Sequence, residues 1–446
     1  MAPSSALTAV VLAACLGLAS ADYIIDVKLK KFVAPYGQAA NGRCCDSITR
    51  RNCECRFFCP KYLLCDLKFE VCVEGAEQEG SCATGWRSTG VIKRNADSVD
   101  FEENEDYDEW QNPHATRLKG SFASANGLRI KIRAIDDDGF LNKDDPVDYV
   151  TIDVRDVEIP LNKWEAITNK EGAKRTGDAR TLTSLEYRVR CAEGFLEPDC
   201  EKLAPLDCAG VMKNEGDAAR TVVSRLRLAS SYKIYEAVCI INEEKEAWTV
   251  VQSRQMGTED FDRTYAEYEQ GFGKITEDHW LGLEKMYSLS RAGGENSQRL
   301  RFVMTDCDGT SKMMEYQSFQ LVRTRDAESG VNFYHLQVGE VTTNAEHITA
   351  GDSINSTAFG DALQVNGRPF TAKDMDLDGG PTSNCASSGN GGWWYNYCSG
   401  SRLNGQWTND CKDWLHGMLW ISFSGDFTKM IKTSKIMIAK RVVGGL

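Results

Sequence analysis

Basic residues are in deficit in this sequence, and long apolar runs are almost absent from it. Lys and Arg number 52 against 65 Asp and Glu, which gives a formal net charge of −13 at pH 7. Binding to nucleic acid phosphates requires a basic surface, so this balance argues against nucleic acid as a partner. After residue 18 no stretch is apolar for long enough to cross a bilayer, so we expect no transmembrane segment.

Histidine, repeats and catalytic motifs are also scarce or missing. The five histidines are scattered, and their spacing relative to the cysteines does not fit a zinc site. Heptads, collagen-like triplets and other internal repeats are absent, so no region indicates an oligomerising stalk. The sequence has no nucleophile elbow, phosphate loop or paired-histidine metal motif, and we therefore predict a binding protein, not an enzyme.

The start of the sequence has the pattern of a secretory signal. An apolar run over 6–18 is followed by small residues at 19–21, which is typical of a signal-peptide cleavage site. We therefore predict a signal peptide over 1–21 and a secreted, extracellular protein. Of the 17 cysteines, Cys15 falls in this segment, which leaves 16, an even number. Paired cysteines in secreted chains normally form disulfides.

Alternating apolar residues in the first half predict strands. The pattern is clearest over 128–133, and it recurs at 27–30, 149–154 and 186–190. Several such strands with polar turns predict a β-sandwich, in which the segment 128–133 pairs with the segment 149–154. The acidic stretch 98–110 is interpreted as a loop. The same half carries a block of eight cysteines whose connectivity the sequence leaves open. They are Cys44, Cys45, Cys53, Cys55, Cys59, Cys65, Cys72 and Cys82.

Three alternate aspartates begin the most distinctive stretch of the second half. Asp374, Asp376 and Asp378 precede a glycine-rich turn, and oxygen ligands on such a loop suit Ca²⁺, which takes roughly six to eight oxygens. An acidic triplet alone is more often a solvated turn, so both interpretations stay open on these residues. Twelve residues lie between Cys385 and Cys398, so a disulfide here would close a tight surface loop beside the ion.

The order of these residues, followed by tryptophans at 393–394 and Leu-Asn-Gly at 403–405, resembles the calcium-site region of fibrinogen-related domains. The resemblance covers 208–446, with Cys208 and Cys239 at the places of the family's first disulfide. It implies an α+β fibrinogen-like globular domain at the C-terminal end of the chain.

The resemblance also implies a calcium site with defined ligands. Asp376 and Asp378 would supply the side-chain oxygens, and backbone carbonyls of 379–383 would complete the shell. Asp374 would orient the loop instead of binding the ion directly. Calcium is therefore the expected cofactor.

Many fibrinogen-like domains bind acetyl groups or peptide knobs in a pocket beside this loop, so a glycan or an acetylated compound is a candidate ligand. Tyr395, Tyr397 and Trp407 are the candidate aromatic lining of that pocket. Ser399 stands where the family often has a histidine. Because serine offers neither a ring nor a cation, the lectin interpretation loses its main residue. The tryptophans at 393–394 are expected in the core.

Three further patterns concern local structure and modification. Apolar residues at 261, 265 and 268 have helical spacing and predict a helix that is closed by Gly271-Phe272-Gly273. Cys307 and Cys411 have no expected counterparts in the family; they either bridge each other, which parity favours, or form intermolecular bonds. Asn355 begins the N-glycosylation acceptor pattern at 355–357, which fits a secreted surface.

The first half resembles the N-terminal domain of Delta- and Jagged-type Notch ligands over 22–191. The resemblance rests on the opening strand, the adjacent cysteines at 44–45, the segment 65–72 and the strand that ends at Cys191. It implies a β-sandwich related to calcium- and phospholipid-binding modules. The segment from Cys191 to Cys200 resembles only the first disulfide loop of the Delta–Serrate–Lag module, whose other cysteines are absent.

Five aspartates surround the turn after the strand 128–133. They are Asp136, Asp137, Asp138, Asp144 and Asp145. In phospholipid-binding sandwiches, aspartates on such loops hold calcium at a membrane surface. The alternative is a solvated hairpin end, and the sequence favours it.

Together these patterns predict a multidomain chain. Its segments are a signal peptide at 1–21, a disulfide-rich all-β sandwich at 22–190, a short cysteine loop and linker at 191–207, and the fibrinogen-like domain at 208–446. We expect a secreted recognition protein that binds a cell-surface receptor of the Notch type. The alternative is a soluble, calcium-dependent pattern-recognition lectin.

Overall fold

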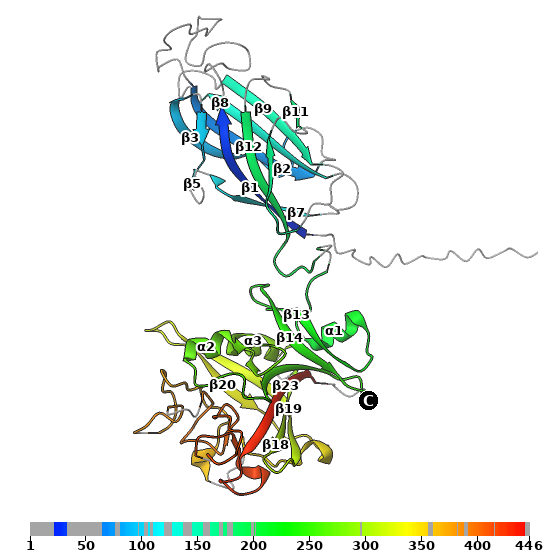
Figure 1. Cartoon of the computed structure of the whole chain (residues 1–446), viewed down its shortest axis with the longest axis vertical. Helices are drawn as coiled ribbons and strands as arrows, with labels where there is room; N and C mark the ends of the chain where they lie inside the picture. Colours follow the sequence, from blue (N-terminus) through cyan, green and yellow to red (C-terminus); the bar gives the residue numbers. More distant parts are fainter. Residues whose placement is uncertain are drawn as a thin grey trace, which may run out of the picture. The chain divides into compact units, whose positions relative to one another are not determined.

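The structure is a computed structural model in which the chain divides into two compact units between Leu203 and Ala204 (Figure 1). This division falls inside the segment 191–207 that the sequence indicated as a linker. The described residues are 22–33, 65–75, 81–96, 98–101, 106–107, 110–119, 127–136, 145–154, 161–168, 173–175, 182–197, 200, 202–294, 297–355, 360–380, 382–387, 391–413 and 415–441. The following predicted features lie outside them: the signal peptide at 1–21, Cys44, Cys45, Cys53, Cys55, Cys59, Asp137, Asp138 and Asp144.

The N-terminal unit is a sandwich of two five-stranded antiparallel sheets (Figure 1). The first sheet contains β1 (Asp22–Val33), β4 (Ser98–Asp100), β7 (His114–Lys119), β10 (Glu165–Thr168) and β12 (Leu182–Cys191). The second contains β2 (Cys65–Gly75), β3 (Arg87–Ala96), β8 (Leu128–Asp136), β9 (Asp145–Val154) and β11 (Ala173–Arg175). The strand orders are β10-β12-β1-β4, with β7 also paired to β1, and β11-β9-β8-β2-β3.

The alternating pattern of β8 explains its central position in the second sheet. Leu128, Ile130 and Ile132 are at most 1% exposed, because every second side chain of the strand points into the core. The strand lies between β2 and β9, with Ile132 opposite both Val71 and Val150. The predicted pairing of this segment with the following strand is confirmed.

Charged side chains are also buried in this sandwich. Lys131, which the alternation places on the outer side of β8, is buried and forms an ion pair with the fully buried Glu74 of β2. In the first sheet Asp26 is buried and accepts ion pairs from Arg188 and Arg190 of β12, at 2.8 and 2.9 Å. Each buried charge therefore has a counter-charge on a neighbouring strand, as burial of an ion requires.

The interpretation of 98–110 as a loop is wrong where the structure describes this segment. It contains β4 and two further short strands, β5 (Asp106–Tyr107) and β6 (Trp110–Gln111). Val99 and Trp110 are 2% and 1% exposed and belong to the core. The acidic residues between them concealed these apolar anchors in the sequence.

The C-terminal unit is built on one nine-stranded sheet (Figure 1). Its strands are β13 (Arg220–Arg227), β14 (Ile234–Ile241), β15 (Ala247–Arg254), β16 (Phe272–Gly273), β17 (His279–Trp280), β18 (Gln298–Asp306), β19 (Ser311–Arg325), β20 (Asn332–Val338) and β23 (Ile431–Lys440). The main order is β13-β14-β15-β23-β18-β19-β20. A second, two-stranded ribbon pairs β21 (Ser401–Arg402) with β22 (Leu419–Trp420).

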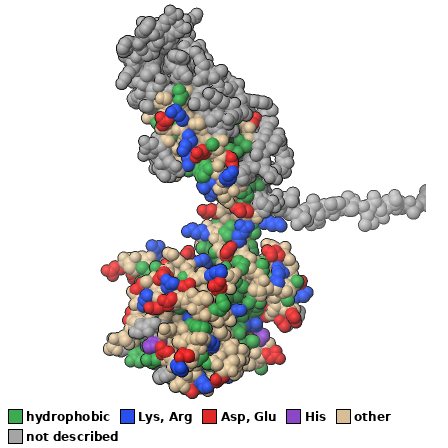
Figure 2. Space-filling view, viewed as in Figure 1, with side chains coloured by type: hydrophobic (Ala, Val, Ile, Leu, Met, Phe, Trp, Pro, Cys, Tyr) green, Lys and Arg blue, Asp and Glu red, His purple; other side chains and the backbone are tan. Residues whose placement is uncertain are grey.

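Three short α-helices accompany this sheet: α1 (Cys208–Glu215), α2 (Tyr265–Gln270) and α3 (Leu283–Ser290). Within the described part of the chain, no helix is long and apolar enough to cross a membrane. Acidic and basic side chains are interspersed over the visible face of this unit (Figure 2), so the net negative charge is not gathered into one patch there.

The central strand and the start of α2 follow from local sequence. Every residue of β15 is buried, and the strand lies between β14 and β23. α2 begins one turn later than the helical spacing predicted, because Thr264 and Glu267 form a capping box at its N-terminus. Phe261 precedes the helix and is buried beside it in the same core.

Candidate functional site

The segment from Phe370 to the tryptophans at 393–394 is held in place by buried aromatic rings. Phe370 and Trp393 are fully buried and Trp394 is 3% exposed, so the prediction that both tryptophans belong to the core is confirmed. Thr371 and Trp393 exchange two backbone hydrogen bonds, of 2.8 and 3.1 Å. The three aspartates of the loop therefore project from a rigid base.

Asp374 is directed toward a helix, away from the turn that follows it. Its Oδ1 accepts a 2.7 Å hydrogen bond from the backbone N–H of Tyr265, the first residue of α2. This contact satisfies one of the N–H groups that a helix start leaves without an internal partner. Asp374 thus fixes the loop against α2.

Asp376 and Asp378 form the turn itself. Asp376 is exposed, and its Oδ1 accepts a 3.3 Å hydrogen bond from the backbone N–H of Asp378. Asp378 is partly buried and accepts from the backbone N–H groups of Gly380 at 2.6 Å and Cys385 at 2.7 Å. Partial burial, with a smaller contribution from the neighbouring carboxylate of Asp376, raises the pKa of Asp378 above its ordinary value, although the two backbone N–H groups oppose this rise.

The carboxylate oxygens of Asp376 and Asp378 are of the type that calcium prefers as ligands. The charge of Asp376 contributes to the raised pKa of Asp378, and a bound cation would oppose that contribution. Among the described residues, however, the three aspartates do not gather three carboxylate oxygens around one point. A calcium ion would therefore use Asp376, Asp378 and backbone carbonyls of the turn, with Asp374 in its separate role at α2.

Close backbone packing and a disulfide define the other side of the turn. A Cβ added to Gly379 would lie 2.6 Å from the Asn396 side-chain oxygen, so no larger residue fits there without a shift. Cys385 and Cys398 form a disulfide, and the Cys398 backbone N–H lies 2.9 Å from the Cys385 sulfur. The bond closes the loop from Cys385 to Cys398, which contains Asn396.

The four residues expected to line an acetyl pocket do not share one environment. Tyr395 is 1% exposed and donates a hydrogen bond from its hydroxyl to the Gly391 carbonyl. Ser399 is 2% exposed, and its hydroxyl bonds to the backbone of Ser401. Tyr397 is 51% exposed. The Trp407 ring packs between the backbone of Gly257 and the Lys432 ammonium, which lies 4.1 Å from the ring centre.

Comparison with known proteins decides the family. Residues 204–441 match the family model of the C-terminal globular domain of fibrinogen beta and gamma chains. The chain belongs to this family. Fibrinogen C domain-containing protein 1-A of Xenopus laevis is 31% identical over 252 residues, which are 56% of this chain and 49% of the relative. Human angiopoietin-related protein 7 is 34% identical over 193 residues, which are 43% of this chain and 49% of that protein.

The chain spans about half the length of these curated relatives. Among solved structures, the fibrinogen-like globe domain of human ANGPTL2 is similar, with 30% identity, coverage of 53% of this chain and 100% of that domain, and a TM-score of 0.43. Outside the fibrinogen-like domain, residues 24–190 match the family model of the N terminus of Notch ligand C2-like domains. The chain therefore combines a Notch-ligand-like N-terminal domain with a fibrinogen-like domain.

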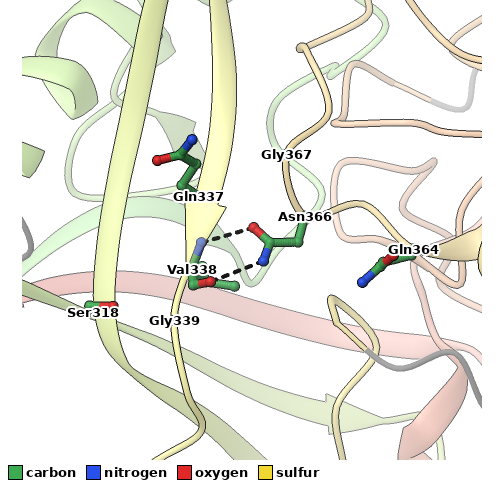
Figure 3. A pocket seen from close by; sticks show the side chains of 7 residues that line it. All are labelled: Ser318, Gln337, Val338, Gly339, Gln364, Asn366 and Gly367. Atoms are coloured by element: carbon green, nitrogen blue, oxygen red, sulfur yellow. Dashed lines mark hydrogen bonds between the residues drawn. The ribbon is translucent and has the colours of Figure 1, made fainter.

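The fibrinogen-like domain also contains a cavity that sequence reasoning missed (Figure 3). It has a volume of about 340 Å³ and is lined by Ser318, Gln337, Val338, Gly339, Gln364, Asn366 and Gly367. The Asn366 side chain donates to and accepts from the backbone of Val338, both at 3.0 Å, which fixes the loop wall to β20. These lining residues carry amides and a hydroxyl but no charge. No motif marks them in the sequence, so only the fold brings them together.

Asn355 lies at the edge of this cavity. Its side-chain nitrogen donates a 3.3 Å hydrogen bond to the Gly339 carbonyl, and its Oδ1 accepts one of 2.6 Å from Asn366. Ser356 and Thr357, which complete the acceptor pattern, lie outside the described residues.

The other disulfides among the described residues connect cysteines within each unit. In the fibrinogen-like domain the structure joins Cys208 to Cys239 and Cys307 to Cys411, so the last two bridge each other within one chain. In the N-terminal unit it joins Cys191 to Cys200 and Cys72 to Cys82. The second of these is one pairing of the block that the sequence left open. Its two sulfurs lie beside the Glu74 carboxylate, but as a disulfide they offer no thiolate to a metal.

Proposed function

We propose that this protein is an extracellular recognition protein that engages a cell-surface receptor of the Notch type through its N-terminal domain. The observation that carries the proposal is the match of residues 24–190 to the N-terminal C2-like domain of Notch ligands. This domain has a hydrophobic core of its own, formed by both sheets of the sandwich. Fold similarity alone does not determine function, so receptor binding has to be tested directly.

The short cysteine loop from Cys191 to Cys200 is consistent with a receptor-binding surface of limited size. Cys200 is fully buried in the core of the N-terminal unit, and Phe195 packs against the same core. A backbone hydrogen bond of 2.8 Å from Leu196 to Lys202 closes the loop. The loop is therefore an extension of the N-terminal domain. Because it corresponds to only the first disulfide loop of a Delta–Serrate–Lag module, we expect a modest affinity.

The test is direct binding to the Notch ectodomain. We expect the full chain and the fragment 22–203 to bind, and the fragment 204–446 not to bind, with each fragment checked for folding by circular dichroism. Binding only by the second fragment would move the receptor face to the fibrinogen-like domain. Loss of binding in all three samples would reject the proposal.

We further infer that Asp376 and Asp378 hold a calcium ion that stabilises the fibrinogen-like domain, and that the protein is secreted after removal of residues 1–21. The adjacency of the two carboxylates and the raised pKa of Asp378 support the calcium site. N-terminal sequencing of protein from the culture medium tests secretion; we expect it to begin at Asp22. Isothermal titration of calcium into protein from which a chelator has removed bound ions tests the calcium site. An absence of binding heat would contradict the site.

A lectin is the second candidate function. The uncharged amide-lined cavity of Figure 3 favours it, because neutral polyols both donate and accept hydrogen bonds. A glycan array that includes acetylated sugars tests this function. Gln337→Ala is the cavity variant, and Gln406→Ala, at an exposed residue outside the cavity lining, is its control. Capture that depends on calcium and on Gln337, without Notch binding, would favour the lectin.

A further inference from the structure

A second cavity lies in the N-terminal unit. It has a volume of about 240 Å³ and is lined by parts of β2, β3 and β7 and by the segment before β3. Val71 and Val73 of β2, which are 1% and 2% exposed, supply an apolar part of its wall. The cavity therefore lies between strands of the two opposed sheets.

The segment that completes the wall is anchored at several points. The disulfide between Cys72 and Cys82 ties its beginning to β2. The Thr84 hydroxyl then donates a 2.7 Å hydrogen bond to the Val73 carbonyl. Gly85, which also lines the cavity, has a φ of +87°, a conformation that other residues adopt at a cost. The cavity is thus pre-formed by covalent and hydrogen-bonded contacts.

The charged groups of this cavity are all basic. Arg87, Arg117 and His114 line it, and no Asp or Glu is among the described residues that do. Arg117 has another interaction within the protein. The Arg87 side chain, in contrast, is exposed and forms no ion pair or hydrogen bond with any residue that the structure describes. An exposed guanidinium thus lies beside a partly buried imidazole, with no carboxylate among the described lining residues, so the Arg87 N–H groups are available to an anion from solution.

His114 is positioned by an aromatic stack. Its ring lies 4.6 Å from the Trp110 ring at an angle of 22°, and its nitrogens bond to no described residue. Burial, and secondly the positive charge of Arg87, lower the pKa of His114 below its ordinary value. Across the strand pair His114 lies opposite Val27. The charged residues next to Val27 are Asp26 and Lys28, and both are paired with residues of β12.

We propose that this cavity is a binding site for a tetrahedral oxyanion, a phosphate or sulfate group carried on a small apolar moiety. The Arg87 guanidinium offers paired N–H donors that match two oxygens of such a group. The Thr116 hydroxyl and the His114 imidazole, which line the same wall, supply further donors. Val71 and Val73 provide the apolar surface for the carbon that carries the anion.

The site couples anion binding to protonation of His114. In the free protein Arg87 disfavours the imidazolium, whereas a bound anion favours it. A bound anion therefore raises the pKa of His114. By linkage, the affinity for the anion increases as the pH falls through the range between the pKa of His114 in the complex and its pKa in the free protein. This behaviour distinguishes the site from a purely electrostatic surface patch, which has no titrating member.

The test uses the full chain with inorganic phosphate and methyl phosphate as probes, at an ionic strength held constant with chloride. The chemical shift of the His114 ring is followed by NMR over a pH series and during titration with each probe. The first series gives the pKa of His114, and the titration gives the dissociation constant of the probe. We expect Arg87→Gln to raise the pKa of His114 in the absence of phosphate and to weaken phosphate binding by about tenfold. Arg325→Gln, which removes an exposed arginine of the C-terminal unit, makes the same charge change and should leave both quantities unaltered.

Two outcomes would overturn the proposal: equal phosphate affinity in the two arginine variants, or a His114 pKa that phosphate does not change. A second arm identifies the source of the anion. Vesicles of phosphatidylcholine with and without phosphatidic acid are mixed with the wild type and Arg87→Gln. Vesicle binding that requires both phosphatidic acid and Arg87 assigns a lipid headgroup. Binding of the soluble probes alone assigns a soluble ester.

Discussion

At the scale of single residues, the aspartate loop separates two kinds of carboxylate. Asp374 is committed to the backbone N–H of Tyr265 at the start of α2. Asp376 and Asp378 belong to one turn, where the charge of the first adds to the effect of burial on the second. Three acidic residues at equal spacing thus have different local roles, and each role has its own measurable consequence.

Removal of the proposed ligand pair should lower stability only when calcium is present. For Asp376→Ala with Asp378→Ala, we expect a loss of about 3 kcal/mol at a calcium concentration one hundredfold above the dissociation constant. In a chelator the change should be small. Scanning calorimetry measures both conditions. Asp217→Asn, in an exposed pair with Lys245, is the control. Equal shifts with and without calcium would show that the pair stabilises the loop without an ion.

The pH dependence of calcium binding should report the raised pKa of Asp378. Calcium requires the carboxylate, so protonation competes with the ion. Affinity should be constant at pH values above the raised pKa and should fall as the pH drops through it. Calorimetric titrations over a pH series measure this change. An affinity that falls only below the ordinary range of aspartate would contradict the role of burial.

Asp374 should behave in the opposite way to its two neighbours. We expect Asp374→Ala to cost about 1 kcal/mol, a typical value for the loss of a side-chain oxygen at a helix N-terminus. Because the partner is the Tyr265 N–H, the loss should be the same in calcium and in chelator. Urea unfolding in both conditions checks this. A loss seen in calcium alone would instead place Asp374 among the ligands.

At the scale of secondary structure elements, strand periodicity was the most reliable sequence signal. It located β8 and its pairing with β9, because apolar alternation reports burial directly. It could not indicate that Lys131 is buried, since that depends on Glu74 from a distant strand. The acidic stretch 98–110 concealed Val99 and Trp110 for a related reason, because local charge outweighs isolated apolar residues in a sequence pattern.

The candidate sites show the same limit. The aspartate loop and Cys385 with Cys398 are local in sequence, so a family resemblance sufficed to find them. The cavity of Figure 3 joins β19 and β20 to residues 364–367 and has no local pattern. Likewise, nothing in the sequence indicated that Tyr395 and Ser399 are buried while Tyr397 is exposed.

The buried pair of β2 and β8 gives an element-scale prediction. Glu74→Ala should destabilise the N-terminal unit by about 3 kcal/mol or more, because it leaves the Lys131 ammonium in the interior without that carboxylate. The double variant Glu74→Leu with Lys131→Met should recover much of the loss, since it removes both buried charges. Urea unfolding of the N-terminal unit checks the pair. A double variant less stable than the single one would show that the ion pair itself is favourable.

At the scale of the whole molecule, the two units have separate cores and separate disulfides. Each described disulfide joins cysteines on the same side of the division between Leu203 and Ala204. Hydrophobic clusters likewise stay within one unit. A substitution in one unit should therefore change the free energy of unfolding of that unit alone, and the chain should unfold in two transitions.

The long-range disulfide of the fibrinogen-like domain makes this separation testable. Cys307 and Cys411 are 104 residues apart in sequence, so their bond restricts the unfolded chain over a long loop. Cys307→Ser with Cys411→Ser should lower the stability of that domain by about 3–4 kcal/mol and leave the transition of the N-terminal unit unchanged. Scanning calorimetry resolves the two transitions. Because the bond lies within one chain, non-reducing electrophoresis should show a monomer for the wild type. A dimer that disappears in the double variant would show instead that these cysteines join two chains, and the expected loss of domain stability would then have no structural basis.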